Sequence, residues 1–466
     1  MEFIKSNKNK LLLVYNSYTY REEKMYKESK YWKCIDMKCK GRLTTTSDNI
    51  IKKEPSEHNH VPDICKLEVK KEVERMKSQA LSSQDNPQQI IASSQLNPVI
   101  SGALPEISNL KHTLRRVRQR NDCAPPNPQS LFNLQIPERY TLTKDGRQFM
   151  QYDSGPSDER ILIFFTKENL ELMEKYNNWF VDGTFKCTPT LFTQIYTIHV
   201  LTTNSLIPTV YALLPNKSQK TYVHLLKQLK TIKSTLSPTS IMSDFEMASI
   251  NAFKEVFPNV KQKGCHFHFS QCIWRKIQQI QYMAQKYISD STFSIQIRIL
   301  LLALAYVPEN HVIDAFEELI DSPYYTDNEN ILQPLIDYFE DTWIGRPMGR
   351  RKGRRSPKYS ISLWNCYESA STLLPRTNNA VEGWHRGFSS LLGAYHPTLW
   401  TFIDVLKDQQ HLEDIKLEQF IAGAKKHQKK IYKNCSEKIR NLTLSYNIND
   451  NINYLKGIAY NLTLQM

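Results

Sequence analysis

Residues 179–185 of the chain are Trp-Phe-Val-Asp-Gly-Thr-Phe, an apolar run that ends in an acidic residue. A run of this kind, closed by an Asp-Gly turn pair, is typical of a buried strand, and Asp182 would project from its carboxyl end. Two further acidic residues have comparable settings. Asp244 ends a second apolar run, and Glu382 lies near the start of a predicted helix in the stretch 376–388. These three acids form one candidate site.

Each acid alone also has a purely structural explanation. Asp182 can belong to a turn, Asp244 can cap the helix that follows it, and Glu382 can be a first-turn helix acid. Three converging carboxylates raise one another's pKa unless divalent cations neutralise them, so a shared site predicts Mg²⁺ or Mn²⁺. Two such ions can activate a water or a 3′-hydroxyl and stabilise the leaving oxygen of a phosphodiester. A shared site would therefore cut or join nucleic-acid strands.

The stretch 140–397 has a pattern of strands and helices around the first two acids. From residue 179 the predicted order is three strands and a helix, then strand, helix, strand and helix. That order is typical of an RNase H-like mixed sheet, in which an antiparallel set joins parallel strands, and it puts Asp182 and Asp244 on neighbouring strands. The predicted elements are strands 161–165, 179–182, 193–201, 207–214, 239–244 and 260–267 and helices 167–176, 221–236, 247–257 and 271–281.

Helical apolar spacing then continues from about 271 to 370 and separates Asp244 from Glu382 by far more than an ordinary loop. We therefore expect an all-helical insertion in an RNase H-like core of about 178–272. Residues 398–466 are predicted to be a C-terminal helical segment, with helical stretches at 399–406 and 417–444. The predicted fold class is multidomain α/β, with a small antiparallel β domain at the N-terminus.

That N-terminal domain spans 3–60, with short strands expected at 11–15, 31–34 and 41–46. It contains two cysteines separated by four residues and, after a further eighteen residues, two histidines separated by one residue. Two thiolates and two imidazoles make a closed tetrahedral site, which is the pattern of structural rather than catalytic zinc. A chance clustering is the alternative. The predicted zinc ligands are Cys34, Cys39, His58 and His60.

The chain of 466 residues has a formal net charge of +14, and much of the positive charge is concentrated at 111–120 and 346–358. Basic stripes of this kind suit a polyanion, although each can also be a solvated surface. The first stripe belongs to a predicted linker, 62–139, that carries one or two short basic helices. The candidate DNA-contacting residues in the two stripes are Arg115, Arg116, Arg350, Arg351, Arg354 and Arg355.

Nine cysteines spread through a long chain do not resemble a disulfide framework, so a reducing compartment is expected. The apolar runs at 11–15 and 299–307 are too short for a secretory signal or a membrane span. The basic run 350–355 could act as a nuclear import signal. We therefore expect a nuclear protein without a membrane partner.

Two resemblances to known families follow from these motifs. The stretch 3–60, with its Leu-Leu-Leu-Val-Tyr strand and its two Cys and two His, resembles a FLYWCH zinc finger. The stretch 140–400, with 179–185 and 376–388, is similar to a MULE transposase domain of the Mutator type. This resemblance implies that the catalytic DDE residues of the family fall on Asp182, Asp244 and Glu382. Its Cys-x-x-His motif falls on Cys265 and His268, and a packing, DNA-contact or metal role stays open for that pair.

Together these features predict a transposable-element-derived DDE transposase that cleaves DNA at element ends and transfers the freed 3′-hydroxyl to target DNA. The resemblance implies structural zinc, catalytic Mg²⁺ or Mn²⁺, DNA as the partner, a homo-oligomer when active, and no small-molecule substrate. The alternatives are a domesticated DNA-binding or transcription regulator, or a FLYWCH protein-interaction module without turnover. Trp384 and His385 beside the third acid could stack on an unpaired base, or Trp384 could be a buried helix anchor.

Overall fold

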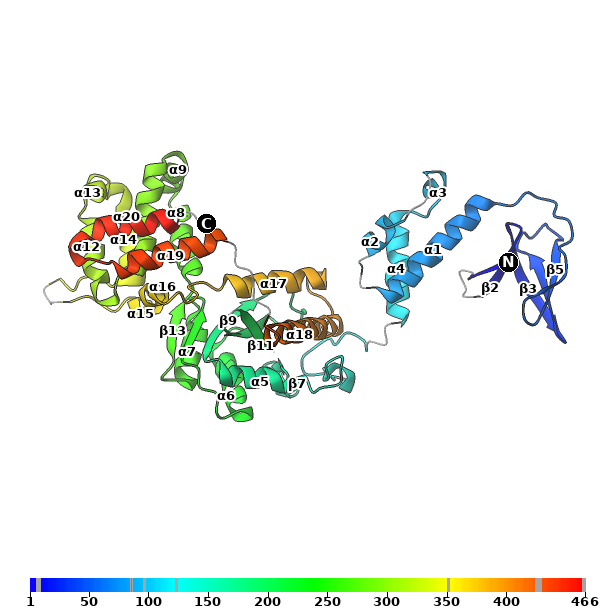
Figure 1. Ribbon diagram of the computed structural model, residues 1–466, viewed down its shortest axis with the longest axis horizontal. Helices are drawn as coiled ribbons and strands as arrows, with labels where there is room; N and C mark the ends of the chain where they lie inside the picture. Colours follow the sequence, from blue (N-terminus) through cyan, green and yellow to red (C-terminus); the bar gives the residue numbers. More distant parts are fainter. Residues whose placement is uncertain are drawn as a thin grey trace. The chain divides into compact units, whose positions relative to one another are not determined.

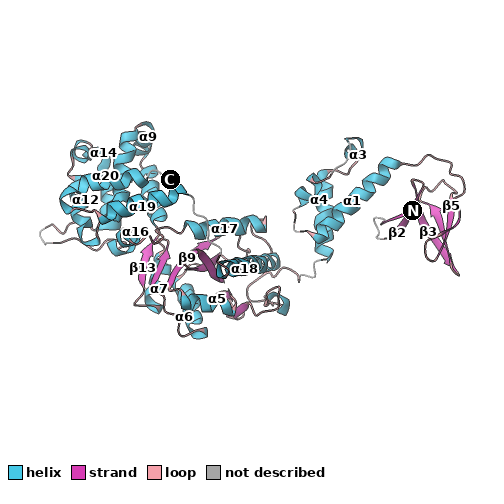
Figure 2. Cartoon of the chain, in the orientation of Figure 1, coloured by secondary structure: helices cyan, strands magenta, loops and turns pink. Residues whose placement is uncertain are grey.

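The computed structural model describes residues 1–5, 10–83, 85, 87–94, 98–121, 125–203, 205–349, 353–423 and 430–462. It consists of two compact units, Met1–Pro126 and Asn127–Met466, which we call the N-terminal and C-terminal units (Figures 1 and 2).

The N-terminal unit begins with a six-stranded antiparallel sheet in which each strand pairs with the next one along the chain. Asn16 and Ser17 join two of these strands with positive φ angles of 47° and 65°, as a tight hairpin turn requires. Tyr20 and Trp32 are buried at the centre of the sheet. The strands are β1 (Glu2–Lys5), β2 (Leu11–Tyr15), β3 (Tyr18–Tyr26), β4 (Ser29–Cys34), β5 (Arg42–Thr46) and β6 (Ile51–Lys53).

Four helices follow where the sequence predicts a linker with one or two. They are α1 (Ile64–Ser82), α2 (Pro87–Ala92), α3 (Pro98–Gly102) and α4 (Ile107–Asn121). Met76, Ile90 and Leu114 contribute to an apolar core that α1, α2 and α4 share. Arg118 of α4 donates hydrogen bonds to the carbonyls of Ala80, Ser83 and Asp85, which satisfies the end of α1. The segment is therefore a small packed helical bundle.

The C-terminal unit is built on a mixed sheet with the strand order β13-β12-β9-β10-β11-β8-β7. Strands β9, β10 and β11 pair antiparallel, whereas β12 runs parallel to β9 and β13 parallel to β12. The strands are β7 (Met150–Asp153), β8 (Leu162–Phe164), β9 (Asn178–Thr184), β10 (Gln194–Leu201), β11 (Leu206–Leu214), β12 (Ser240–Ser243) and β13 (Lys261–Gly264).

Alternation along β9 sends its side chains to opposite faces of the sheet. Trp179 and Val181 join the core formed with helices α5 (Lys167–Lys175), α6 (Gln219–Ile232) and α7 (Met247–Val256). Phe180 instead packs with Val381 of α17 (Asn379–Leu392), so α17 covers the other face. Asp182 has the same parity as Phe180 and therefore lies on the α17 side.

A helical lobe separates β13 from α17. Its core also includes residues of the C-terminal helices, and Figure 1 shows α19 and α20, in red, among the helices of the insertion. The predicted C-terminal segment is thus divided, because α18 packs on α17 whereas α19 and α20 complete this lobe. The helices are α8 (His266–Gln279), α9 (Gln281–Ser289), α10 (Ser291–Ser294), α11 (Leu300–Ala303), α12 (Val312–Ile320), α13 (Pro323–Asp327), α14 (Glu329–Phe339), α15 (Ile361–Trp364), α16 (Tyr367–Ser371), α18 (Leu399–Ile421), α19 (Lys430–Leu444) and α20 (Asn451–Leu462).

Three boundaries differ from the sequence expectation. Strand β9 continues past Asp182 to Thr184, because β10 keeps pairing with it. The strand expected at 260–267 ends at Gly264, and helix α8 starts at His266. The helix expected at 417–444 is not continuous, because α18 ends at Ile421.

In the described ranges, no single helix has both the length and the apolar character needed to cross a membrane. One pair of helices, Gln281–Ser289 and Ser291–Tyr306, meets the length and composition criteria only when the two helices are counted together. They are bent by 115° relative to each other.

Candidate functional site

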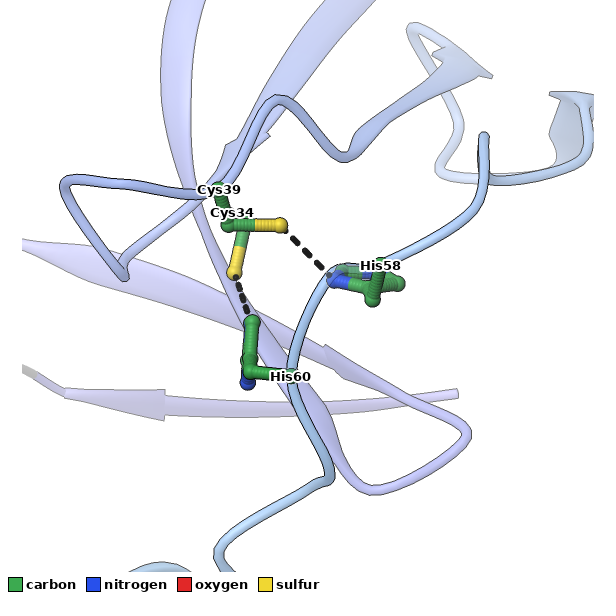
Figure 3. Close-up of side chains that lie close together, drawn as sticks. All are labelled: Cys34, Cys39, His58 and His60. Carbon is green, nitrogen blue, oxygen red and sulfur yellow. Dashed lines mark hydrogen bonds between the residues drawn. The ribbon is translucent and has the colours of Figure 1, made fainter.

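The four predicted zinc ligands converge in the N-terminal unit, with their ligand atoms all within 4.8 Å of one another (Figure 3). Cys34 Sγ lies 3.4 Å from His60 Nε2, and Cys39 Sγ lies 3.3 Å from His58 Nδ1. Both cysteines are buried. Strand β4 ends at Cys34, and the two histidines come from the segment after β6, so the site ties the end of the domain back to its sheet. This two-Cys, two-His cluster fits zinc binding.

The remaining ring nitrogen of each histidine is also occupied. Tyr20 Oη lies 2.8 Å from His58 Nε2, and His60 Nδ1 lies 3.0 Å from the Val61 carbonyl oxygen. Such outer contacts fix the orientation and tautomer of a metal-ligating imidazole. Gly41 leaves room for the first ring, since a Cβ atom there would lie 2.6 Å from His58 Cε1. These contacts therefore hold both imidazoles in orientations that suit metal binding.

In the C-terminal unit, a series of contacting polar side chains leads from Asp182 to His199. Its Oδ2 lies 3.4 Å from Nδ1 of His385 on α17. The other nitrogen of His385 lies 3.0 Å from Thr197 Oγ1, which lies 3.0 Å from His199 Nε2. Thr197 also donates to the Asp182 carbonyl at 3.3 Å. Burial and nearby His385 hold the pKa of His199 well below its usual range, so the His199 ring is neutral.

Asp244 directly follows β12, the parallel neighbour of β9. The structural alternative that it caps α7 is not met, because Glu246 is the residue that precedes the helix. Burial, Asp182 and Glu246 raise the pKa of Asp244 to about 6, and His268 partly opposes them. The rise shows that two carboxylates close to Asp244 add negative charge where little water can screen it.

Glu382 lies in the first turn of α17. His268 Nε2 of α8 lies 3.6 Å from Glu382 Oε1, so the same histidine stands near the second and the third acid. Glu382 Oε1 is buried and has no hydrogen-bond partner among the described residues. A buried carboxylate oxygen without a partner is costly, and a cation would satisfy it.

Three contacts fix the start of α17. The Asn378 backbone N–H donates to Cys265 Sγ at 3.1 Å, and its side-chain Nδ2 donates to the Val181 carbonyl at 3.0 Å. His266 N–H donates to the Arg376 carbonyl at 2.9 Å. These contacts link the segment before Glu382 both to α8 and to the strand that carries Asp182. Cys265 thus accepts a backbone hydrogen bond at the start of the helix, and His268 lies 3.6 Å from Glu382.

The residues fit a divalent cation by their chemistry, because Asp244 lies close to two other carboxylates and Glu382 has an unsatisfied oxygen. The three acids are not gathered as closely as the four predicted zinc ligands of the N-terminal unit. In the described part of the chain, only the Cys34, Cys39, His58 and His60 group already stands at metal-binding distances.

The predicted DNA-contacting residues have different surroundings. Arg115, Arg116 and Arg355 are exposed, whereas Arg350 and Arg351 lie outside the described residues. Arg354 is largely buried, and its guanidinium pairs with Glu317 at 2.7 Å and Glu340 at 2.9 Å. The two ion pairs compensate the charge of Arg354, so Arg354 is a poor candidate for a DNA contact.

Trp384 is half-buried, with its indole stacked on Phe388 at 5.2 Å and on Tyr211 at 5.5 Å between ring centroids. That packing is typical of a helix anchor. Sequence reasoning considered neighbouring His385 only for stacking on a base and did not consider Asn378 or Thr197. Polar residues flanking an acid on a helix were the available signal.

Comparison with protein families agrees with both resemblances. Residues 178–272 match the model of the MULE transposase domain, and residues 3–60 match that of the FLYWCH zinc finger domain. The chain therefore combines a MULE transposase domain with a FLYWCH zinc finger. The MULE match runs from the start of β9 into α8 and includes Asp182, Asp244, Cys265 and His268, but it ends well before Glu382.

The chain is also similar to the human FLYWCH-type zinc finger-containing protein 1, with 32% identity over 93 residues. That similarity covers 19% of this chain and 12% of the human protein. The FLYWCH and MULE domains together support a transposase-related DNA-binding protein, and the finger's Cys and His cluster supports a structural zinc ion.

Proposed function

We propose that the C-terminal unit is an RNase H-like DDE transferase that cleaves a DNA strand and joins its 3′-end to target DNA. The strand order β11-β10-β9-β12-β13, with three antiparallel strands followed by two parallel ones, supports this fold assignment. The observation that carries the function is the placement of Asp182 on β9 and of Asp244 directly after β12, the parallel neighbour of β9, with His268 3.6 Å from Glu382.

In this proposal Asp182, Asp244 and Glu382 hold Mg²⁺ or Mn²⁺. When bound, such ions supply an activated water or 3′-hydroxyl and stabilise the leaving oxygen of the phosphodiester. His385 would orient the Asp182 carboxylate, and Thr197 would hold His385 and the Asp182 main-chain carbonyl. Asn378 and Cys265 fix the first turn of α17 and so the position of Glu382. Pre-orientation of this kind lowers the cost of assembling the reacting geometry.

The zinc finger would bind DNA, and exposed Arg115, Arg116 and Arg355 would contact phosphates without reading sequence. We further propose a nuclear location and a homo-oligomer in the active complex, because joining two element ends to one target requires more than one active site.

The test is a nicking assay on supercoiled plasmid that carries the flanking DNA of the element, with purified full-length protein. Wild-type protein should nick only with Mg²⁺ or Mn²⁺. Asp182→Asn, Asp244→Asn and Glu382→Gln should each reduce the rate at least a hundredfold while DNA binding in a gel-shift assay stays unchanged. Glu255→Gln is the matched control, since Glu255 is a partly exposed helix acid paired with Lys227.

If any one of the three variants nicks at the wild-type rate, that residue has no catalytic role. If the wild-type protein binds the DNA but never nicks it with either metal, the chain is better described as a DNA-binding regulator that keeps the fold without turnover.

A further inference from the structure

A cavity of about 680 Å³ lies between helix α8, the segment before α17, and helix α19. Its wall includes His266, Phe267, Arg376 and Tyr432. Asn379 also lines it and precedes Glu382 by three residues, about 4.5 Å of rise along α17. The cavity therefore lies within one helical turn of Glu382, and none of the three acids lines it.

Arg376 contributes a positive charge without a counterion. Across the described part of the chain, no carboxylate lies within ion-pair distance of Arg376, and its buried Nη1 has no hydrogen-bond partner. Its Nη2 donates to Ser436 Oγ at 3.4 Å, and its Cζ lies 5.4 Å from the Tyr306 ring centroid. The planar fork of a guanidinium matches the oxygens of a phosphate. Arg376 is therefore the group in this cavity that would bind an anion.

His266 adds a second unsatisfied group to the same wall. Its side chain is only 6% exposed, and its Nε2 has no hydrogen-bond partner among the described residues. Burial and nearby Arg376 lower the pKa of His266 to about 4, so the ring is neutral. A neutral imidazole edge is a polar partner for a nucleobase rather than a second phosphate contact.

Two aromatic side chains at this cavity are open to solvent. Phe267 is 37% exposed and Tyr432 is 47% exposed. Exposed aromatic rings beside an unpaired arginine make the side-chain set that binds single-stranded nucleic acid, because bases stack on the rings while the cation holds the backbone. The volume is within the range of cavities that enclose small ligands.

We propose that this cavity binds one unpaired nucleotide of the DNA substrate, with its phosphate on Arg376 and its base against Phe267 and Tyr432. The proposal rests on the proposed function, because that function brings a DNA strand to the neighbouring acids. A paired base cannot enter, so the nucleotide must leave the stack, and the cost of leaving is smallest where it is already unpaired. The protein should therefore prefer DNA with an unpaired nucleotide.

The experiment measures binding of full-length protein to two fluorescent duplexes of one sequence, fully paired or with a single bulged nucleotide, by anisotropy without Mg²⁺ or Mn²⁺. The ratio of the two affinities cancels the contribution of the zinc finger. The bulged duplex should bind about tenfold more tightly to wild-type protein. Arg376→Gln and Tyr432→Ala should bring the ratio close to one. Tyr432 is a surface residue, so its variant keeps the test valid if the arginine variant fails to fold.

Two matched controls should keep the ratio. Arg440→Gln removes an exposed cation from the same helix as Tyr432, and Tyr282→Ala removes a ring that is 48% exposed elsewhere in the lobe. Deoxyadenosine monophosphate should compete with the bulged duplex more effectively than inorganic phosphate does. Equal competition would mean that the cavity takes a phosphate alone and would overturn the nucleotide assignment.

A wild-type ratio of one, or cavity variants that keep the wild-type ratio, would also overturn the proposal. Glu255→Gln, the control of the nicking assay, should also keep the ratio. Metal-dependent nicking with a ratio of one would leave the proposed function standing without this cavity. If the ratio depends on Arg376 but the protein never nicks DNA, the cavity binds a nucleotide and the proposed cleavage function fails.

Discussion

Replacing Asp244 with asparagine should make the metal-free protein more stable. The structure raises the pKa of Asp244 to about 6 from its ordinary 3.8, first through burial and then through Asp182 and Glu246. The difference of about 2.2 units corresponds to about 3 kcal/mol, at 1.36 kcal/mol per unit. Asparagine has the same shape and keeps an oxygen for the Glu246 N–H, which donates to Asp244 at 3.3 Å. It removes only the charge.

The sign of the effect depends on pH. Below pH 3.8 the carboxyl is protonated in both folded and unfolded chains, and it costs nothing. Between pH 3.8 and 6 the unfolded chain ionises first, so the penalty on the folded state grows, and above pH 6 it is constant. Asp244→Asn should therefore gain its full advantage above pH 6 and lose it near pH 4.

The assay is thermal unfolding of full-length protein followed by calorimetry, with zinc retained and no Mg²⁺ or Mn²⁺ added. For the 340 residues from 127 to 466, unfolding entropy of about 0.7 kcal/mol/K turns 3 kcal/mol into a Tm increase of about 4 °C at pH 8. Added Mg²⁺ should raise the wild-type Tm but not that of Asp244→Asn. A variant that melts at or below the wild-type temperature at pH 8, or a difference that ignores pH, would refute the reasoning.

Two further predictions concern other parts of the chain. Gly41→Ala should weaken zinc binding about 10–100-fold in a chelator competition, because the added Cβ would displace the His58 imidazole. Gly102→Ala is the control, since its Cβ would meet no atom within 4 Å and zinc affinity should not change. Equal zinc affinities of the two variants would show that the space at Gly41 is not needed for the zinc site. Arg354→Gln should destabilise the C-terminal unit by about 3 kcal/mol in calorimetry, because it breaks the ion pairs with Glu317 and Glu340. Arg355→Gln should keep the Tm and weaken DNA binding to all sequences alike. The opposite pattern would mean that Arg354 contacts DNA and Arg355 stabilises the fold.

Local sequence was enough for the elements whose pattern is set by their own residues. The zinc cluster followed from spacing, the strand at 11–15 from a short apolar run, and the strands at 193–201 and 207–214 from alternating apolar residues. The FLYWCH and MULE resemblances are confirmed by the family comparisons. Strand β7 was missed because all four of its residues are half-buried at the sheet edge, and they form no apolar run.

The end of β13 depended on a tertiary contact. Gly264 lies so close to Phe245 that a Cβ would be 2.4 Å from its ring, and the chain turns into α8 there. Nothing in the sequence of 260–267 announces that approach. Contacts over long sequence separations were equally hidden, such as Asp182 with His385 and Arg354 with Glu317. A basic residue in a basic stretch gives no sign that its charge is already paired inside the fold.

The position of Glu382 is set where the long helical lobe joins the sheet. The start of α17 is fixed by Cys265, directly before the first helix of the lobe, and by Val181 of β9. Closing a loop costs only about 0.6 kcal/mol for each doubling of its length, so a lobe of this size can be accommodated between the two points. Its own apolar core, completed by α19 and α20, supplies the stability to hold it. The lobe is then free to provide substrate contacts, as the Arg376 and Tyr432 cavity beside the acids requires.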